Sequence, residues 1–404
     1  MTSDPALVRE KLNQVVAILR ERDIDLWLTF VRETSQVPDP SLPLVLDLDL
    51  TWTSALMTTR CGERIAIVGR LDAADVERLG VYSTVIGYDQ SIRGPLREQL
   101  LRLDPRQIAV NYSLGDPASD GLTHGMYLLL QDYLDETDLA RRLISAESVI
   151  AALRGRKSAT ELARVTSAVR AAEAIFRHVG ESIAPGLTEK KIAQLFQRAA
   201  VDQGLGLAWG VNHCPTVSAG PDSPVGHAGP GDYALQRGHL LQVDFGVEKD
   251  GFVSDLQRTW YVPREGESGP PQLVAAAWEA ARRALEAGRA ALSPGARGWE
   301  VDRAARGALV NAGYEEYMHA FGHHIGRTAH DGATVLGPRW DRYRDSVEGR
   351  VEAGNTFAIE LGVRVEGYGY IGCEEDVLVT DSGADYLCEP QRELWLLPAS
   401  KSRG

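Results

Sequence analysis

Two aspartates embedded in apolar, strand-like runs are the residues of this 404-residue chain that first require a chemical explanation. Asp244 lies in the run 240–246 and Asp255 in the run 252–260. Two carboxylates that lose their water together need a shared proton, a cation or a metal ion. The structural alternative is that both acids lie at the exposed ends of a hairpin.

The turn between these runs predicts how the two aspartates are oriented. The dipeptide Asp-Gly at 250–251 is typical of a two-residue hairpin loop. Such a loop would place Asp244 opposite Gln257. Both aspartates then point to the same face of the sheet, one diagonal step apart.

Histidines gather further along the chain. Four of the nine histidines fall in the segment 318–330, namely His319, His323, His324 and His330. Neutral imidazole binds metal ions and carries protons near neutral pH, and glycines beside the adjacent pair allow a close backbone approach. His324 follows His323 and faces elsewhere if the segment is extended, so a structural role is the better interpretation for it.

Acids also interrupt two later strand-like runs. Glu360 lies in the apolar run 357–363, and three consecutive acids occupy 374–376. One shared metal centre is the most economical explanation for acids in several strands beside a histidine cluster. Oxygen-rich ligands with one imidazole suit manganese, cobalt or zinc, and four carboxylates can bridge two ions roughly 3.5 to 4 Å apart. A dinuclear hydrolytic centre of this kind needs no serine or cysteine nucleophile.

Composition excludes several functional classes. The formal net charge of −13 argues against binding to nucleic acid and to anionic membrane surfaces. The apolar runs are shorter than the roughly 18 to 20 residues of a membrane span, and the first residues do not form a signal peptide. We therefore predict a cytoplasmic protein. Its four cysteines lack metal-ligand or disulfide spacing and are predicted to be free thiols.

The first part of the chain has the pattern of an alternating α/β domain. Helical patterns occur at 7–19, 71–79 and 95–103, and strand-like runs at 24–30, 44–50, 65–68 and 108–110. This part contains neither a glycine-rich phosphate loop nor a nucleophile elbow. We therefore expect it to serve packing, oligomerisation or partial closure of an active site.

The boundary between two domains is predicted near residue 154. There a strand-like segment at 148–152 gives way to a long helix, whose start carries the capping-box pair Ser158 and Glu161. A chain of 404 residues is long enough for two domains that each have a core.

The second part of the chain repeats a helix-helix-strand pattern. A Pro-Gly dipeptide separates the two helices of each of two predicted pairs. Gly186 and Gly204 lie eighteen positions apart, and so do Gly295 and Gly313. The alternative is coincidence, because Pro-Gly breaks are common. An internal duplication predicts a pseudo-symmetric α/β domain with a site in the cleft between its halves.

The order of these acids and histidines resembles the ligand pattern of the M24 metallopeptidases, the family of Xaa-Pro dipeptidase, aminopeptidase P and methionine aminopeptidase. Its marks here are the interval of eleven between Asp244 and Asp255, the Gly-His-xxx-Gly segment with a histidine seven residues on, the strand glutamate, and the final Glu-acid-Asp-Val-Leu-Val-Thr strand. The resemblance covers about residues 155 to 398.

The resemblance implies an α/β (α+β) chain of two domains. Residues 1–154 look like a creatinase/prolidase-type N-terminal α/β domain, and residues 155–404 like a pseudo-symmetric catalytic domain with the pita-bread fold. Methionine aminopeptidases generally lack such an N-terminal domain, so the Xaa-Pro branch is favoured. Relatives with this domain are commonly dimers or larger, which implies a homodimer.

Carried over residue by residue, the resemblance implies five metal ligands. Asp244 would bind one ion, Asp255 and Glu374 would bridge both ions, and His323 and Glu360 would bind the second. The implied cofactor is a pair of divalent ions, manganese first, with cobalt or zinc as alternatives. Strand alternation alone leaves Glu374 and Glu375 open, and the family pattern selects Glu374.

The resemblance also implies residues that act on the substrate. His227 and His330 match outer histidines that stabilise the substrate and the tetrahedral intermediate, and His319 matches another histidine of the cleft. Glu360 would also shuttle protons. The implied catalytic residues are therefore His227, His330 and Glu360.

Two positions depart from the family pattern. Leu361 stands where a proline is common, and Gly372 stands where the Xaa-Pro enzymes have an arginine that shapes the substrate end of the site. Strict Xaa-Pro specificity is therefore open. Arg364, or else Arg339 or Arg342, could supply a substitute cation for the carboxylate of a dipeptide.

The implied function is hydrolysis of the N-terminal peptide bond of dipeptides or short peptides, with Xaa-Pro as the leading substrate class. Alternatives on the same scaffold are a metal-free, creatinase-like C–N hydrolase and a catalytically silent binding module. Both usually lose the acidic ligands, whereas all five ligand types are present here. The expected partner is a peptide substrate, without nucleic acid or membrane.

Overall fold

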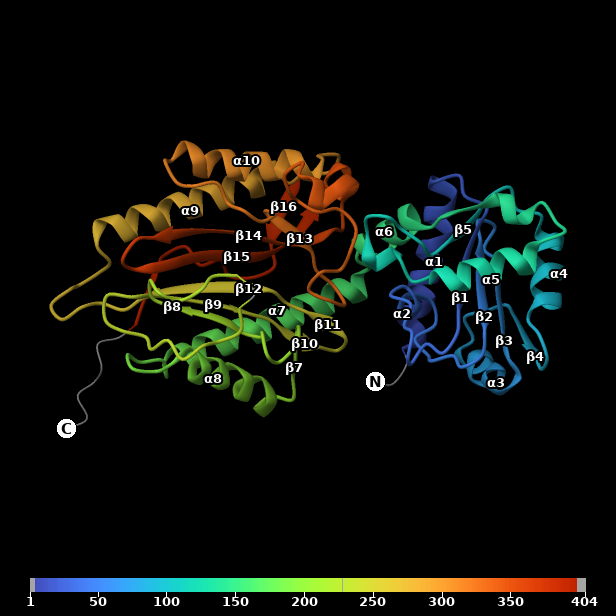
Figure 1. The fold of residues 1–404 in the computed structure, drawn as a ribbon, viewed down its shortest axis with the longest axis horizontal. Coiled ribbons are helices and arrows are strands. Elements are labelled where there is room, and N and C mark those ends of the chain that lie inside the picture. Colours follow the sequence, from blue (N-terminus) through green and yellow to red (C-terminus); the bar gives the residue numbers. More distant parts are fainter. Residues whose placement is uncertain (1–3, 227, 398–404) are drawn as a thin grey trace. The chain divides into compact units, whose positions relative to one another are not determined.

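The computed structural model describes residues 4–226 and 228–397. The chain divides into two compact units, Met1–Arg154 and Gly155–Gly404, and each is described by itself (Figure 1). No helix within the described ranges is both long and apolar enough to cross a membrane. All four cysteines are free thiols, as predicted.

The first unit contains a six-stranded sheet in the order β4-β3-β2-β1-β5-β6. β2 runs antiparallel to both of its neighbours, and the other neighbouring strands are parallel. The strands are β1 (Leu26–Val31), β2 (Ser54–Thr59), β3 (Arg64–Gly69), β4 (Thr84–Tyr88), β5 (Ile108–Val110) and β6 (Leu143–Ser145). The helices are α1 (Pro5–Glu21), α2 (Leu42–Val45), α3 (Arg70–Leu79), α4 (Arg93–Leu103), α5 (His124–Leu134) and α6 (Glu147–Gly155), with 3₁₀ turns at Pro117–Ser119 and Leu139–Arg142.

Helices cover both faces of this sheet. Side chains along a strand alternate between faces, so β1 contributes to two apolar cores. Trp27 belongs to the core that includes residues of α1, α3 and α6, whereas Leu28 belongs to the core that includes residues of α4 and α5. The alternating α/β pattern predicted for this part of the chain is confirmed.

Two strands predicted in this unit are wrong. The run 44–50 begins in helix α2 and contains no strand, and the run 148–152 lies inside helix α6. A short apolar run does not by itself distinguish a buried helix from a buried strand. In α6, the buried residues Val149, Ile150 and Leu153 recur at the spacing of one helical face.

The second unit folds around a larger sheet in the order β13-β14-β15-β12-β9-β8, to which β16 and β17 add beside β15 and β12. A smaller sheet has the order β11-β10-β7. The strands are β7 (Gly206–Leu207), β8 (Thr216–Ala219), β9 (Leu240–Phe245), β10 (Val247–Lys249), β11 (Phe252–Val253), β12 (Leu256–Tyr261), β13 (Gly322–His324), β14 (Thr356–Val365), β15 (Gly369–Thr380), β16 (Gly383–Tyr386) and β17 (Trp395–Leu396). The helices are α7 (Ala159–Gly180), α8 (Glu189–Asp202), α9 (Gln272–Ala291) and α10 (Gly298–Asn311), with a 3₁₀ segment at Asp341–Glu348.

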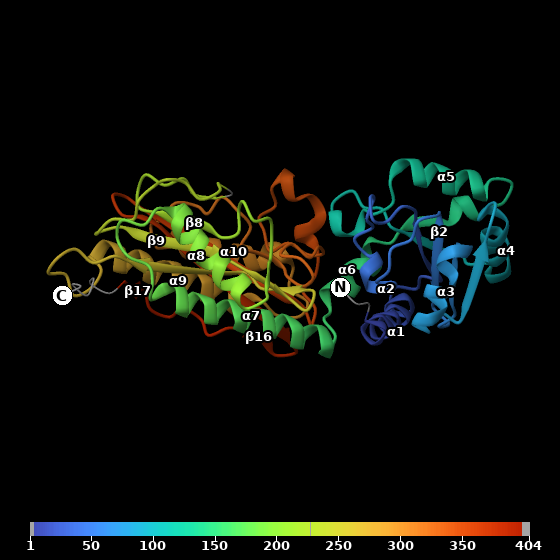
Figure 2. The same cartoon turned by 90° about the horizontal axis from the view of Figure 1, so that it is seen from below.

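The helix pairs α7–α8 and α9–α10 pack against different strands of this unit (Figures 1 and 2). Helix α9 contacts β14 and β15, whereas α8 contacts β8 and α7 contacts β10 and β12. The predicted capping box of Ser158 and Glu161 starts α7.

The two helix pairs have matching connections. The N–H of Gly186 donates to Leu235 O at 2.7 Å, and the N–H of Gly295 donates to Val351 O at 2.8 Å. The two glycines have φ values of 94° and 92°, which glycine adopts far more readily than other residues. The pseudo-symmetry predicted from the Pro-Gly spacing is therefore present in the backbone.

Candidate metal centre

A β-hairpin brings the two aspartates to one face of the sheet, as predicted. Asp250 and Gly251 have φ values of 53° and 76°, and a type I′ two-residue loop requires positive φ at both positions. Asp244 pairs with Gln257. The hairpin is interrupted at Asp255, between β11 and β12, and the N–H of Asp255 donates instead to the Oδ2 atom of Asp376 at 3.0 Å. The interruption therefore leaves no buried backbone donor unsatisfied at this point.

Three carboxylates lie in one row across four neighbouring strands. Asp244 on β9 pairs with Gln257 on β12, Gln257 pairs with Glu374 on β15, and Glu374 pairs with Glu360 on β14. Directly opposed residues project from the same face of a sheet. A slip of one residue in any of these pairings would send a side chain to the other face. The row therefore depends on the register of the whole sheet.

These side chains line a cavity of about 180 Å³ in the second unit. All five ligand-type residues predicted from the sequence lie in its wall. The described lining residues are Trp209, His213, Thr216, Val225, Gly226, Gln242, Asp244, Asp255, Gln257, Tyr317, His319, His323, Ala329, His330, Glu360, Tyr370 and Glu374. The cavity thus combines four carboxylates with several imidazoles.

Asp255, His323 and Glu374 come closest to a ready metal-binding group. Their ligand atoms lie within 4.8 Å of one another. The Nε2 atom of His323 is 3.9 Å from Asp255 Oδ2 and 3.9 Å from Glu374 Oε1. The Nδ1 atom of His323 lies 2.9 Å from the carbonyl oxygen of Ala329, which favours a proton on Nδ1 and leaves Nε2 free to bind a metal. Burial also lowers the pKa of His323 to about 3, so the ring is neutral.

Loss of water makes the acids of this cavity hard to ionise. Desolvation, followed by the charge of Glu360, raises the pKa of Asp244 to about 7. Desolvation likewise raises the pKa of Glu360 to about 7. The pKa values of Asp255 and Glu374 are raised well above their ordinary range, first by burial and then by the neighbouring carboxylates. A bound cation would reverse this effect by compensating the negative charges.

Unpartnered oxygen atoms indicate that a cation fits this cluster. Asp244 Oδ1 and Glu374 Oε2 are buried and receive no hydrogen bond from the described residues. A buried carboxylate oxygen without a partner is costly. Divalent cations such as manganese favour carboxylate and imidazole ligands. The donor set of this cavity therefore fits a divalent metal ion.

The structure separates the two glutamates that the strand pattern left open. Glu374 lines the cavity, whereas Glu375 accepts ion pairs from Arg258 at 3.1 Å and Arg282 at 3.2 Å. Neighbouring residues of a strand point to opposite faces. Glu375 is therefore neutralised by arginines on the reverse face of the sheet.

The predicted histidines fall into three groups. His319 and His330 line the cavity as exposed residues, and the ring of His330 lies 4.4 Å from that of His323. His324 is buried and does not line the cavity, in agreement with a structural role. His227 lies outside the residues that the structure describes.

The candidate substrate arginines do not line this cavity. Arg364 is exposed and donates to the carbonyl oxygens of Pro221 at 3.0 Å and Ser223 at 3.5 Å. Arg339 forms an ion pair with a glutamate, and the guanidinium of Arg342 lies over an aromatic ring.

The cavity also contains residues for which no role was predicted. Gln257 Nε2 donates to Glu360 Oε2 at 3.0 Å, and the hydroxyl of Tyr317 donates to the same atom at 3.2 Å. Tyr370 and Gln242 lie in the wall beside them. The hairpin register identifies Gln257 as the partner of Asp244, and this pairing was the one available signal for it.

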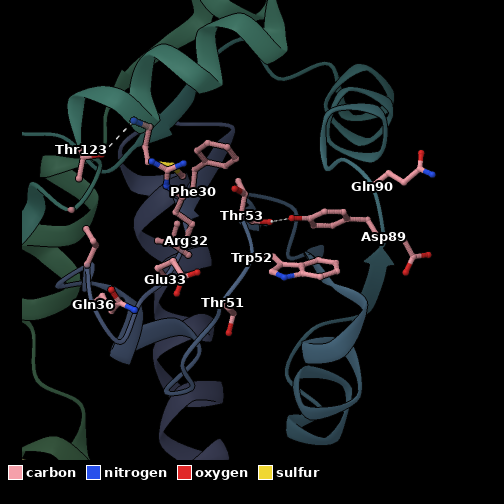
Figure 3. Close-up of a pocket in the computed structure, with 15 residues that line it drawn as sticks. Phe30, Arg32, Glu33, Gln36, Thr51, Trp52, Thr53, Asp89, Gln90 and Thr123 are labelled. Carbon is pink, nitrogen blue, oxygen red and sulfur yellow. Dashed lines mark hydrogen bonds between the residues drawn. The ribbon is translucent and has the colours of Figure 1, made fainter.

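A second and larger cavity lies in the first unit (Figure 3). Its volume is about 660 Å³, and it lies at the carboxyl ends of β1 and β4. Trp52 and Tyr88 form part of its wall with ring centroids 5.8 Å apart, and Asp89 is paired with Arg70. Among the described residues, the only group of three metal-ligand side chains lies in the second unit instead. The smaller cavity is therefore the candidate site.

Comparison with known proteins gives a consistent assignment. The model of "Metallopeptidase family M24" matches residues 163–381, which is more than half of the chain. The chain is 29% identical to a Xaa-Pro dipeptidase of Lactobacillus helveticus over 62% of this chain and 64% of that protein. It is 31% identical to a probable dipeptidase PepE of Mycobacterium tuberculosis over 64% of each chain. These matches span slightly less than two thirds of the relatives' length.

Solved structures resemble the chain over nearly its full length. The dipeptidase PepE from Mycobacterium ulcerans is 26% identical, with a TM-score of 0.73 and coverage of 98% of this chain and 99% of that one. A Xaa-Pro dipeptidase from Bacillus anthracis is 21% identical, with a TM-score of 0.73 and coverage of 96% and 100%. The likeness to the second structure concerns the fold alone.

Metal ions are expected to stabilise the folded protein. Addition of manganese to chelator-treated protein, at a free concentration a hundredfold above its Kd, should raise the free energy of unfolding by about 2.7 kcal/mol. Thermal or denaturant unfolding with and without the ion measures this shift. The double variant D255N/E374Q is the control and should lose the shift. The same stabilisation in that variant would mean that the ions bind elsewhere.

Proposed function

Because the chain belongs to the metallopeptidase family M24, we propose that it is a dinuclear metallo-exopeptidase that removes the N-terminal residue of dipeptides or short peptides. The pita-bread fold expected for this family is shown by the structural likenesses. The observation that carries the proposal is the row of Asp244, Glu374 and Glu360 on one cavity face, beside Asp255 and His323.

We propose that the cavity holds two divalent ions. Asp244 would be a terminal ligand of one ion, Asp255 and Glu374 would bridge, and His323 and Glu360 would bind the other. Manganese is the first choice, with cobalt or zinc as alternatives, because the donors are oxygen-rich and include one imidazole. When bound, such ions supply Lewis-acid chemistry that polarises a peptide carbonyl and activates water. The unpartnered oxygens of Asp244 and Glu374 support this assignment.

The other residues of the cavity would act on the peptide. Glu360 would transfer a proton between the attacking water and the leaving amine, a role for a carboxylate within hydrogen-bond reach of both. His330 and His319 would donate hydrogen bonds to the substrate and to the tetrahedral intermediate. Their place in the cavity wall supports these roles. His227 is proposed for the same task on the family pattern alone.

The leading substrate class is Xaa-Pro dipeptides, in line with the names of the relatives. Strict proline specificity stays open, because Gly372 replaces the arginine common in the Xaa-Pro enzymes. The creatinase-like and silent alternatives lack support, since all five ligand types line one cavity. We also propose a cytoplasmic location, a homodimer and a creatinase/prolidase-like N-terminal domain over residues 1–154.

Arg364 is proposed to influence substrate binding through a loop. Its guanidinium donates to the carbonyl oxygens of Pro221 and Ser223, and the same loop supplies Val225 and Gly226 to the cavity wall. Arg364→Ala should therefore raise the KM of a dipeptide and of its C-terminal amide by similar factors. A rise confined to the free dipeptide would instead identify Arg364 as the carboxylate anchor.

The two aspartates are expected to differ in metal binding. Asp255→Asn should disrupt the dinuclear centre and lose both ions, because one of the two bridging carboxylates is removed, whereas Asp244→Asn should retain one. Elemental analysis of the purified variants after dialysis gives the number of ions per chain. Retention of both ions in each variant would contradict the assignment of ligands.

A small panel of peptides tests the activity itself. Release of the N-terminal residue from Ala-Pro, Met-Ala and a Xaa-Pro-Xaa tripeptide should depend on added manganese, cobalt or zinc. Ala-Pro is expected to be the best of the three. Exhaustive chelation should reduce the rate to background. Full activity after chelation would favour the metal-free hydrolase.

A further inference from the structure

Gln257 occupies the centre of the carboxylate row. It lies between Asp244 on one neighbouring strand and Glu374 on the other. Its side chain is buried, with 7% of its surface exposed. A buried amide must satisfy both its donor and its acceptor groups, so the contacts of Gln257 define what it does in this row.

The orientation of the Gln257 amide follows from its two partners. Gln242 Nε2 donates to Gln257 Oε1 at 3.0 Å, and Gln257 Nε2 donates to Glu360 Oε2 at 3.0 Å. The amide nitrogen of Gln257 faces Oε2 of Glu360, and its amide oxygen faces the amide nitrogen of Gln242. The chain of bonds therefore runs in one direction, from Gln242 through Gln257 to Glu360.

A second neutral donor binds the same oxygen of Glu360. The Tyr317 hydroxyl donates to Oε2 at 3.2 Å. Both bonds thus hold Oε2, which leaves Oε1 as the oxygen for a metal ion or a transferred proton. Neutral donors orient the carboxylate without compensating its charge, whereas a cationic donor would weaken its attraction for a divalent ion.

A glycine on β15, Gly372, provides the space for the Gln257 amide. Gly362 and Gly372 are paired directly opposite each other, two residues along the strands from Glu360 and Glu374 and on the same face. A Cβ atom at Gly372 would overlap Gln257 Oε1 and lie 2.9 Å from Gln242 Cγ. A side chain at position 372 is therefore incompatible with the observed position of Gln257.

We propose that Gln257 is a positioning residue, which together with Tyr317 holds Oε2 of Glu360 and so presents Oε1 to the metal centre. Gly372 is a glycine because it has to admit the Gln257 amide. This inference rests on the proposed function, since it assigns Glu360 to the metal and to proton transfer. It also explains why Gly372 stands where the Xaa-Pro enzymes have an arginine: the side chains of Gln257 and Gln242 occupy that space.

The test compares two buried glutamines of the same region. Gln257→Met keeps the volume of the side chain but removes the hydrogen bond to Glu360. Gln391→Met is the matched control, because Gln391 is buried and its side chain bonds backbone groups of Thr259. Gln391 Nε2 donates to Thr259 O at 2.7 Å, and the N–H of Thr259 donates to Gln391 Oε1 at 2.9 Å. Both changes remove buried hydrogen bonds and should lower the melting temperature.

Metal affinity separates positioning from stability. Manganese binding, measured by dialysis and elemental analysis, should weaken by about 10- to 100-fold for one of the two ions in Gln257→Met. The kcat for Ala-Pro should fall by a similar factor, with a smaller change in KM. Gln391→Met should keep both affinities and kcat. Wild-type manganese affinity in Gln257→Met, or an equal loss of affinity in both variants, would overturn the proposal.

Gly372→Ala provides an independent route to the same effect. The added methyl group should displace Gln257 and weaken manganese binding as Gln257→Met does. In a Gln257→Ala background the same glycine change should have little further effect on manganese binding, because the Gln257 amide is gone and Gln242, which the methyl group also meets, contacts Glu360 through that amide. Multiplicative losses in the double variant would show that Gly372 acts independently and would refute the link to Gln257.

The metal measurement also separates this inference from the proposed function. If the wild-type protein binds manganese but hydrolyses none of the test peptides, the proposed peptidase activity fails, and the comparison of metal affinities still tests Gln257. If the peptides are hydrolysed and Gln257→Met binds both ions normally, the positioning role fails and the peptidase activity stands.

Discussion

The structure of the second unit depends on the enclosure of four carboxylates in one small cavity. Asp244, Asp255, Glu360 and Glu374 share a space of about 180 Å³, and loss of water raises the pKa of each acid, with repulsion from neighbouring carboxylates adding to the rise for Asp244, Asp255 and Glu374. Such a cluster opposes folding unless protons or cations neutralise it. The sheet nevertheless holds these side chains in place, because the register of four strands aligns three of them and a break in the hairpin supplies the other. The fold therefore maintains a buried acidic cluster that protons or cations have to neutralise.

The same strands carry acids on both faces, and the two faces are neutralised in different ways. Glu374 projects into the cavity, where carboxylates and imidazoles surround it. Glu375 projects to the reverse face, where Arg258 and Arg282 pair with it and the Cys388 thiol donates to it at 3.1 Å. Arginine side chains are suitable partners for an acid with a structural role, because such an acid never has to exchange its partner. On the cavity side, Glu374 Oε2 and Asp244 Oδ1 receive no hydrogen bond from the described residues. These two oxygens can therefore accept an exchangeable ion.

Short sequence patterns predicted those features of the structure that depend on a few neighbouring residues. The Asp-Gly loop defines the hairpin, so the pairing of Asp244 with Gln257 followed from the sequence. The two Pro-Gly dipeptides likewise predicted the matching helix connections, because each glycine locally adopts the conformation that ends a helix. The prediction of a strand at 148–152 was wrong, because an apolar run of this length does not distinguish a buried helix from a buried strand, and the helical spacing becomes visible only when Leu153 is included. Gln257 and Tyr317 received no role in advance, since their importance arises from contacts with Glu360, which lies 103 and 43 residues away in the chain.

The pseudo-symmetry of the unit has a consequence for how metal binding and folding are coupled. Helix connections repeat with nearly equal geometry at Gly186 and Gly295, yet the ligand-type residues are divided unequally between the halves. Asp244 and Asp255 come from the first half, whereas His323, Glu360 and Glu374 come from the second. An ion held by residues of both halves binds only when the halves are docked, so its binding free energy adds to the stability of their interface. Neither half alone contains the complete donor set, so this site forms where the two similar halves meet.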